Sequence, residues 1–517
     1  MSGGVINSRR IAKNTLFLYF RMIIAMGVSL VTTGVTMRVL GQVDFGLNAV
    51  LGGIVSMFLF MKGAMQASVS RNITFELGRG DAVRLGRVFN VSLLTFAALS
   101  LVVVVLCETV GLWFFYNKMI IPPDRLNAAF WVLQISILTC PLTLTQIPYE
   151  SVLVAHEDMK MYAYTSMADV LARLAIVYML IVSPYDKLIS LVVLRLVWGV
   201  GMLVFYRIYC IVRYSETRFG LCRDRSVYRD VLGFAGADLI GNLSQMAQGQ
   251  GINLLLNTFF GPTVNAARGI AYSVQGAVYR FCDSFQMAAR PQITKSFAAG
   301  NETGMWKLVE WSTCVSYFLV WMAALPVCLE ADCVLRLWLG SFPAHTIEFL
   351  RLVLLLCLLD VLQRPIGFVL HACGHVFLFN VVSGTLYCSA FPLAWFFLRS
   401  GLPPESAFAS VIVTLLLGTV AEMLILKKYV SYSIPRYCAK IVLRCLFVSL
   451  LSAGVTLSVY AHVPFAGFGR VILTTGLAVL TTAGFAFAFG FDREVRDGFV
   501  GFVRGKFAAW RKGRRTQ

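Results

Sequence analysis

Charge is scarce in this sequence, and so is any sign of a soluble domain. Only 14% of the 517 residues are charged, while 58% are hydrophobic and the mean hydropathy is +0.75. A soluble globular domain carries about 25% charged residues, so the composition excludes that class. It indicates a protein that crosses a membrane many times.

Motifs for metal, ATP and enzymatic chemistry are also missing. The sequence has 5 His, and its 13 Cys include no CxxC pair, so no metal site is expected. No Walker A motif occurs, which argues against direct use of ATP. No link between apolar segments exceeds roughly 20 residues, which is too short for a separate catalytic domain. We therefore expect no catalytic residues and no cofactor, with H⁺ and Na⁺ both open as coupling ions.

Basic residues outnumber acidic ones, 45 against 26, which gives a net charge of +19. In a soluble protein this excess would suggest a nucleic-acid partner, but here the basic residues lie in short links between apolar segments. That distribution follows the positive-inside rule, and no nucleic acid is expected as a partner. With both termini in the cytoplasm, the inner links carry 28 Lys and Arg and the outer links about eight.

Apolar windows of about 20 residues predict fourteen membrane spans. The first could be a signal peptide, but Arg21 interrupts its apolar run and no cleavage site follows, so we expect an uncleaved span. A disulfide between Cys328 and Cys333, near an outer helix end, is left open. The predicted span centres lie near residues 25, 57, 100, 139, 172, 199, 246, 276, 319, 358, 388, 415, 450 and 479.

An internal repeat with an offset of 220 residues organises these spans. The stretch "QASVSRNITFELGRGD" (66–81) aligns with "QMAARPQITKSFAAGN" (286–301), and Gly41 aligns with Gly261 upstream. Chance similarity between membrane segments is the alternative, but both copies follow the second span of their half, which favours duplication. Six spans separate the copies, so the halves are parallel repeats. We expect an all-α protein with two pseudo-twofold-related lobes of six helices and two extra helices after them.

The expected domain boundaries follow from this repeat. The C-terminal tail places aromatic residues opposite arginines, which suits either a helix on the membrane surface or a plain solubilising tail. The predicted parts are an N-terminal lobe (1–212), a cytoplasmic linker (213–230), a C-terminal lobe (231–428), two additional spans (429–490) and a basic tail (491–517).

Spans seven and eight carry polar stripes along their length, and Gly249 and Gly251 are expected to loosen span seven beside its stripe. In "VYRFCDSFQMAARPQ" (278–292) and upstream of it, five polar residues of span eight fall within an arc of about 80°. An ionised side chain in mid-membrane costs on the order of 2.5–3.5 kcal/mol, so such residues normally face a wet cavity or a partner. We predict a hydrated cationic cavity lined by Asn242, Gln245, Asn253, Gln275 and Gln286, with Asp238 and Asp283 as candidate ion- or proton-coupling groups.

Other intramembrane charges have structural interpretations. Asp360 with Arg364, and Asp169 with Arg173, are predicted ion pairs at i,i+4 spacing, and Arg280 with Asp283 is open to the same interpretation. A further set is predicted to reach the membrane surface from near the helix ends: Glu150, Arg195, Arg207, Glu310, Glu422 and Arg444. No helical neighbour neutralises Arg21, Lys62, Arg268 or Arg290, and a diphosphate is a good ligand for such arginines.

Three stretches resemble a known family. "SRRIAKNTLFLYFRM" (8–22), "ASVSRNITFELGRGD" (67–81) and "NLLLNTFFGPTVNAARGIAYSVQGAV" (253–278) are similar to Wzx-type polysaccharide flippases of Bacteroides-like bacteria. These belong to the multidrug/oligosaccharidyl-lipid/polysaccharide (MOP) exporter superfamily. The resemblance implies that undecaprenyl-diphosphate-linked oligosaccharide moves from the inner to the outer leaflet by alternating access. By position it assigns substrate binding to Arg21, Lys62, Arg268, Arg280 and Arg290.

The resemblance also implies location and partners. It places the protein in the bacterial cytoplasmic (inner) membrane, with membrane lipids, the lipid-linked oligosaccharide, and the polymerase and glycosyltransferases of the same pathway as partners. Two other functions stay open. One is a cation-coupled multidrug exporter of the same superfamily, and the other is a membrane-embedded glycan polymerase or ligase, which the short outer links disfavour.

Overall fold

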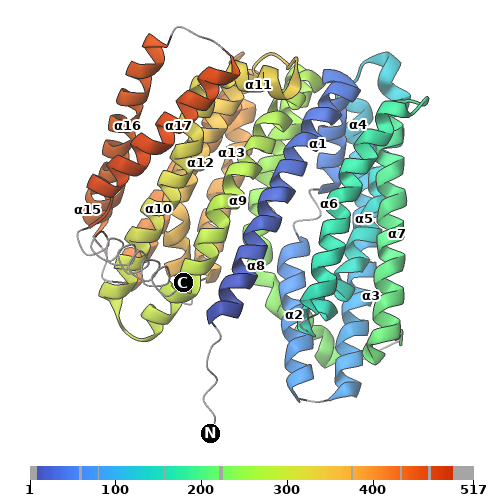
Figure 1. Cartoon of the computed structure of the whole chain (residues 1–517). Coiled ribbons are helices and arrows are strands. Elements are labelled where there is room, and N and C mark those ends of the chain that lie inside the picture. The colour runs from blue at the N-terminus through green and yellow to red at the C-terminus, as the bar shows by residue number, and fades with distance from the viewer. Residues whose placement is uncertain are drawn as a thin grey trace, which may run out of the picture. The chain divides into compact units, whose positions relative to one another are not determined.

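Helices account for all regular secondary structure in the part of the chain that is described. The computed structural model describes residues 8–56, 61–79, 81–156, 158–220, 225–373, 376–430, 433–463, 467–492 and 496. Fourteen of its helices have at least 18 residues, and each predicted span falls on at least one of them. The predicted all-helical fold is confirmed, and Figure 1 shows the long helices.

The helices before residue 221 correspond to the first six predicted spans. Span one and the start of span two form one kinked helix, and span two continues in α2. The elements are α1 (Ser8–Ser56), α2 (Met61–Arg79), α3 (Ala82–Leu106), η2 (Cys107–Gly111), α4 (Leu112–Asn117), η3 (Pro123–Arg125), α5 (Leu126–Ala155), α6 (Met159–Val182), α7 (Lys187–Arg213) and η4 (Ser215–Thr217).

The helices after residue 224 correspond to spans seven to fourteen, with short helices at some of the connections. They are α8 (Arg225–Phe260), α9 (Pro262–Ala298), α10 (Glu302–Leu329), α11 (Ala331–Leu339), α12 (Thr346–Ala372), α13 (Val376–Arg399), α14 (Ser406–Tyr429), α15 (Ile434–Tyr437), η5 (Cys438–Val442), α16 (Leu443–His462), α17 (Phe468–Phe485) and η6 (Ala486–Gly490). Cys328 and Cys333, at the end of α10 and in α11, are both free thiols.

Glycines with positive φ turn the chain at matching points of the two repeat copies. Gly41 has φ 77° and ψ 175° where α1 bends back on itself, and Gly261 has φ 81° between α8 and α9. Positive φ is unfavourable for residues that have a Cβ atom. Glycine has none, which explains its presence at both positions. The aligned N-caps match as well, because Asp81 accepts from the Arg84 amide and Asn301 from the Gly304 amide. The repeat seen in the sequence therefore has a local structural counterpart.

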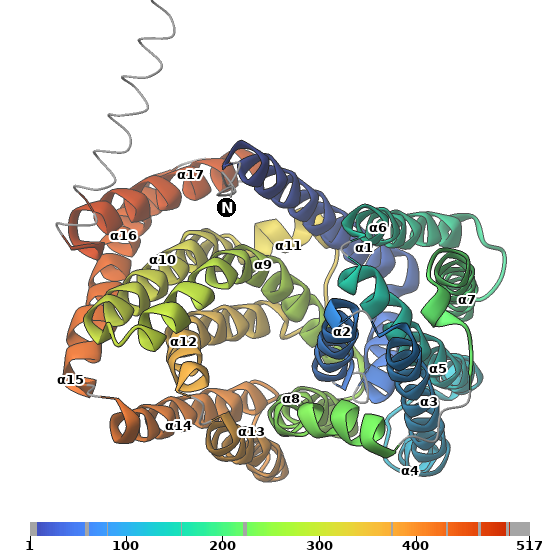
Figure 2. The same ribbon diagram turned by 90° about the horizontal axis from the view of Figure 1, so that it is seen from below.

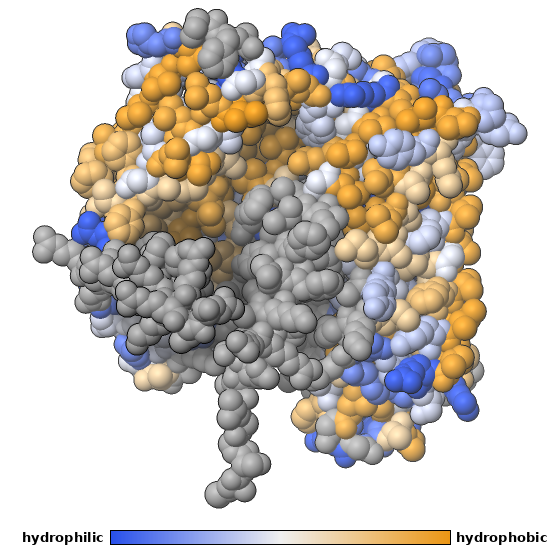
Figure 3. Space-filling model, viewed as in Figure 1, coloured by the Kyte–Doolittle hydropathy of each residue, from blue (hydrophilic) through white to orange (hydrophobic). Residues whose placement is uncertain are grey.

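Many of the helices are long and apolar enough to cross a membrane. Within the described residues, ten meet a length and hydropathy criterion, and α1, α2, α8 and α9 are not among them. Figure 3 shows hydrophobic side chains along the helices, with hydrophilic ones gathered toward the upper and lower ends. Spans seven and eight, in which the sequence places its polar stripes, lie on α8 and α9, two of these four helices.

The chain forms two compact units, and these cut across the predicted domain boundaries in sequence. The first unit contains residues 1–277, 335–352 and 376–418, and the second contains 278–334, 353–375 and 419–517. The division at 212, 230 and 428 into lobes, linker and added spans stays a prediction.

In the first unit, α2, α3, α5 and α7 enclose one large apolar core. Phe89, Leu133 and Leu153 are fully buried in it, and the ring of Phe89 meets Tyr149 edge-on at 5.2 Å. The segment of α1 after Gly41 packs closely on the start of α9. A Cβ at Gly46 would lie 1.8 Å from the Pro262 carbonyl oxygen, so only glycine fits there. In Figure 2, α5, α6 and α7 lie together beside α1.

In the second unit, α16 and α17 pack on α10. The Trp321 indole donates to Ser452 Oγ at 2.9 Å, and Tyr317 packs against the same helix through Ser449. At the start of α17, Arg470 donates two hydrogen bonds to the buried carboxylate of Glu330, at 2.7 and 3.0 Å. These contacts hold the last two long helices against the rest of this unit.

Candidate functional site

Arg268, near the start of α9, is the best-defined candidate for binding an anionic ligand. Only 7% of it is exposed, and its Nη2 donates to the Gly249 carbonyl oxygen of α8 at 2.7 Å. Its guanidinium carbon lies 4.1 Å from the centre of the Tyr272 ring. Its Nε has no hydrogen-bond partner in the described part of the chain. The positive charge is thus held by neutral groups, which leaves it available to an anion.

Asparagines continue the polar stripe at the junction of α8 and α9. Asn265 is fully buried and donates to both the carbonyl and the side-chain oxygen of Asn253, at 2.7 and 2.8 Å. Asn253 in turn donates to the Ala49 carbonyl of α1 at 3.3 Å. Buried amides are stabilised when they are hydrogen-bonded in this way. Asn253 therefore joins helices, and Asn265 is a member of the cluster that the sequence stripe did not include.

The glycines of α8 have roles different from the one expected. Gly249 and Gly251 were expected to loosen the helix, yet α8 is continuous from Arg225 to Phe260. A Cβ at Gly251 would lie 2.6 Å from the Phe391 ring of α13, whereas a Cβ at Gly249 would meet nothing within 4 Å. Gly251 is thus required by close packing, and the carbonyl of Gly249 receives Arg268. The expectation of a loosened helix is wrong.

The remaining predicted residues of the first unit fall into two groups. Gln245 is exposed and Gln275 is half-buried. The neighbouring Gln248 donates to Thr414 of α14 at 3.4 Å, which extends the polar surface of α8. The side chains of Arg21, Lys62, Asp238 and Asn242 lie outside the described residues.

In the second unit, the later part of α9 contains further residues of the predicted site. Arg280 is half-buried, while Gln286 is 3% exposed and its Nε2 has no hydrogen-bond partner among the described residues. The side chains of Asp283 and Arg290 lie outside the described residues. The pairing of Arg280 with Asp283 and the role of Arg280 in substrate binding both stay predictions.

The predicted ion pairs at i,i+4 spacing are confirmed. Arg364 Nε lies 2.6 Å from Asp360 Oδ2, and its guanidinium stacks on Tyr279 at 4.3 Å. Arg173 lies 2.8 Å from Asp169. Pairing at this spacing brings the two charges together within one helix and lowers the cost of placing them in the membrane.

Two carboxylates predicted to reach the membrane surface are buried instead. Glu150 of α5 is 9% exposed and accepts from Gln146 at 2.8 Å, and Gln66 of α2 lies at 3.4 Å. Glu422 of α14 is 1% exposed and accepts from Gln363 at 2.6 Å. The amide donors allow burial because they hydrogen-bond the carboxylate oxygens. Sequence reasoning missed these pairs because each joins different helices or relies on an uncharged partner.

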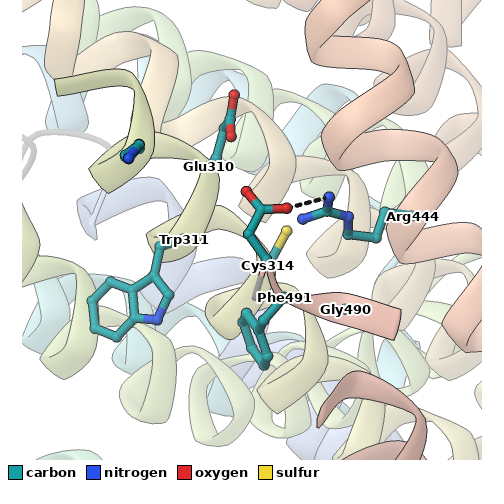
Figure 4. A pocket seen from close by; sticks show the side chains of 8 residues that line it. Glu310, Trp311, Cys314, Arg444, Gly490 and Phe491 are labelled. Atoms are coloured by element: carbon teal, nitrogen blue, oxygen red, sulfur yellow. Dashed lines mark hydrogen bonds and ion pairs between the residues drawn. The ribbon is translucent and has the colours of Figure 1, made fainter. Parts of the chain in front are cut away.

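A small charged cavity lies in the second unit between α10, α16 and the end of η6. Arg444 lies 2.8 Å from the carboxylate of Asp492. Figure 4 shows Arg444 with Trp311 and Phe491, which line the same cavity. Glu310 is 3.7 Å from Lys440. Burial raises the pKa of Asp492, but the hydrogen bond from Arg444 and the surrounding lysines outweigh it and hold this pKa below its usual value. The paired charges join the last helices to α10, so Glu310 and Arg444 pair within the protein.

No protein-family model and no curated protein sequence matches this chain. Solved structures do match it. The lipid II flippase MurJ, in an inward closed conformation, aligns with a TM-score of 0.70 and 11% identity, covering 92% of this chain and 98% of MurJ. The chain has the MOP-superfamily fold. An inward-facing multidrug resistance MATE family transporter of the MOP superfamily aligns with a TM-score of 0.65 and 12% identity, over 80% of this chain and 95% of that one.

A MOP-superfamily transporter from Pyrococcus furiosus also matches, with a TM-score of 0.58 and 13% identity, over 79% of this chain and 94% of that one. Its binding pocket is described as having reversed polarity, which suggested a different function for it. A shared fold does not fix the function, so the ligand of this chain has to be argued from its own residues.

Proposed function

We propose that this protein is a flippase for undecaprenyl-diphosphate-linked oligosaccharide, such as a repeat unit of capsule, O-antigen or exopolysaccharide. It moves the substrate from the inner to the outer leaflet of the bacterial cytoplasmic membrane by alternating access. It is a transporter with no catalytic residues. The observation that carries the proposal is Arg268, a buried guanidinium held only by a carbonyl oxygen and an aromatic ring among the described residues.

The chemistry of Arg268 suits a diphosphate better than a cationic drug. A guanidinium binds phosphate oxygens through two parallel hydrogen bonds, and in a buried site a bound anion offsets its charge. A cation in the same place would be repelled. The likeness to MurJ, whose own substrate is lipid II, supports the same substrate class through the fold.

Further cations are proposed to extend the site along the substrate. Arg21, Lys62, Arg280 and Arg290 would contact the head group, with Asn242, Gln245, Asn253, Gln275 and Gln286 as polar lining. The partners would be the lipid-linked glycan, membrane lipids and enzymes of the same pathway. Asp238 and Asp283 are proposed as coupling groups for H⁺ or Na⁺. Asp→Asn substitution at either position tests this, since a coupling residue would lose the dependence of export on the ion gradient.

A multidrug exporter is the second candidate, and one observation favours it. Glu150 and Glu422 are buried carboxylates whose described hydrogen-bond donors include uncharged glutamine amides. Buried carboxylates are suited to binding an organic cation or a proton. The two candidates differ in the sign of the ligand, so each predicts loss of function from a different substitution.

Export of a surface glycan in cells tests the proposal through Arg268. In the flippase, Arg268→Ala lowers export by about a hundred-fold, and Arg268→Lys restores it only in part because the paired hydrogen bonds are lost. Arg399→Ala serves as the matched control, since Arg399 is exposed at the end of α13. Export by the Arg268→Ala protein at the level of the Arg399→Ala protein would contradict the proposal. If Glu150→Gln or Glu422→Gln removes drug resistance while glycan export persists, the exporter is the better account.

A further inference from the structure

Three charged residues in α6 and α7 of the first unit lie far from the ends of their helices. Arg173 is 14 residues from the start of α6 and nine from its end, which is about 21 Å and 14 Å along the axis. Arg195 is eight residues from the start of α7, or about 12 Å. Asp169 lies one turn before Arg173. Both helices are apolar enough to cross a membrane, with mean hydropathies of 1.7 for α6 and 2.3 for α7 over their best windows.

Arg195 lies on the face by which α7 packs, and that it reaches the membrane surface stays a prediction. At 100° per residue, the buried residues of α7 fall within an arc of about 120°, and Arg195 lies inside that arc. Those buried residues are Leu188, Leu191, Val192, Leu203, Tyr206 and Cys210. The side chain of Arg195 is nevertheless exposed. A side chain on a packing face is exposed only where the neighbouring helices leave space beside it.

The facing part of α6 has the same character. Asp169 and Arg173 fall within the arc of about 120° that holds its buried residues Thr165, Ile176, Val177 and Leu180. Their side chains are 37% and 66% exposed. Exposed charges on the packing faces of both helices indicate a polar opening between them.

The contacts within this group leave one positive charge unmatched. Arg173 Nε donates to Asp169 Oδ2 at 2.9 Å, and the Trp198 indole donates to Asp169 Oδ1 at 3.1 Å, so both carboxylate oxygens are occupied. Arg195 has no hydrogen bond or ion pair in the described part of the chain. Its charge is disfavoured first by the protein atoms packed around it and then by repulsion from Arg173, although its surface is accessible. The cluster carries two guanidiniums and one carboxylate.

We infer that Arg195 and Arg173 form an anion site that binds a phosphate or diphosphate group. An unmatched guanidinium in the membrane is costly, and repulsion by a second one adds to that cost. An anion between them removes both penalties, and the planar fork of Arg195 offers it two parallel hydrogen bonds. The ligand is either free inorganic diphosphate or the diphosphate of a polyprenyl lipid.

This site is separate from Arg268 and adds to the proposed function without depending on it. Arg268 bonds to α8, whereas this group lies on α6 and α7. If the lipid is the ligand, the group gives the proposed flippase a second phosphate contact. If the protein moves another substrate, the site still binds an anion. Binding is therefore measured without transport.

The test measures diphosphate binding to the full-length protein in detergent by isothermal titration calorimetry. Every sample carries the Arg268→Ala substitution, so that Arg268 contributes nothing to the measured binding. Inorganic diphosphate and farnesyl diphosphate are the two probes. We expect Arg195→Gln to weaken binding of at least one probe by about ten-fold or more, the size expected for a hydrogen bond to a charged group. Arg213→Gln is the matched control, because it removes the same charge from the exposed last turn of α7.

Two further variants test the geometry and guard against misfolding. Asp169→Asn removes the carboxylate that competes for Arg173, so we expect tighter binding of the same probe. Arg195→Lys keeps the charge but loses the fork, so we expect an intermediate affinity. Monodisperse elution and an unchanged helical circular dichroism spectrum establish that each variant is folded.

The outcomes separate the ligand sources and the hypotheses. Loss of inorganic diphosphate binding identifies a free anion as ligand, and loss of farnesyl diphosphate binding alone identifies the lipid. If Arg195→Gln and Arg213→Gln bind both probes equally, the anion site is refuted. That result would leave the proposed flippase function untouched, because Arg268 is absent from the background.

Discussion

The helix pairs α8–α9 and α6–α7 each hold an arginine within the first unit, but they treat it differently. Arg268 is buried, donates to a carbonyl oxygen and stacks on a tyrosine. Arg195 is exposed and has no described polar partner, although its helix is far more apolar. The comparison shows that the polarity of a helix does not reveal which of its charges is compensated. Compensation depends on groups from neighbouring helices.

The largest expected difference between the two regions concerns transport. Arg268→Ala should lower glycan export by about a hundred-fold, because truncating a buried, hydrogen-bonded charge costs about 2–5 kcal/mol. Arg195→Ala removes one exposed contact and should lower export by about ten-fold. Export rates from cells with equal amounts of each protein in the membrane measure both effects. Equal losses from the two variants would break the comparison, since the two arginines would then act alike.

Glycine substitutions in α8 test whether its polar stripe stands on a closely packed helix. Gly251→Ala places a methyl group 2.6 Å from the Phe391 ring and should destabilise the protein by about 1–3 kcal/mol. Gly249→Ala meets nothing within 4 Å and should be neutral or stabilising by up to about 1 kcal/mol. Reversible unfolding in mixed detergent micelles compares the two. A larger loss from Gly249→Ala would show that α8 does not pack closely on α13 at Gly251.

The two repeat copies offer a matched pair of helix caps. Asp81→Ala and Asn301→Ala each remove an N-cap side chain that accepts a backbone hydrogen bond, at 2.9 and 2.8 Å. Each should reduce stability by about 1 kcal/mol. The same unfolding assay applies, with Asp→Asn at 81 and Asn→Asp at 301 as variants that keep the cap. A loss in only one copy would show that the structural equivalence of the caps does not extend to energetics.

The smallest expected effect is a pH dependence at the start of α6. Hydrogen bonds from Tyr209 and Tyr214 hold the pKa of Asp158 below its usual value of 3.8, against the effect of burial. A lowered pKa contributes stability that is present above the unfolded value and is lost as the pH falls through the folded value. Melting temperatures of the wild type should therefore drop below about pH 4 more than those of Asp158→Asn. Asp124→Asn, at an exposed position of η3, is the control and should follow the wild type.

Much of the fold follows from the sequence, and the reason is physical. Membrane spans are set by apolar length, and the turn glycines Gly41 and Gly261 repeat because positive φ is required at both. Ion pairs at i,i+4 spacing, such as Asp360 with Arg364, depend only on helix geometry. These features depend on residues that are close together in the chain, so they can be predicted from a single sequence.

Contacts between helices could not be predicted in the same way. Glu150 and Glu422 were expected at the membrane surface, but glutamines on other helices bury them. For Arg195, its place within the buried face of α7 became visible only once the buried residues of that helix were known. Arg38 is a further example, since it donates to the Trp338 and Leu339 carbonyls at the end of α11, some 300 residues away in sequence. Such pairings depend on tertiary packing.

Transport in proteoliposomes tests the central claim most directly. Purified protein is reconstituted with a fluorescent undecaprenyl-diphosphate oligosaccharide in one leaflet, and a membrane-impermeant quencher reports its arrival in the other. Our account predicts transfer by the wild-type protein, loss of transfer with Arg268→Ala, and no accumulation of a cationic dye such as ethidium. Transport of the dye while the lipid-linked glycan stays in its leaflet would contradict it.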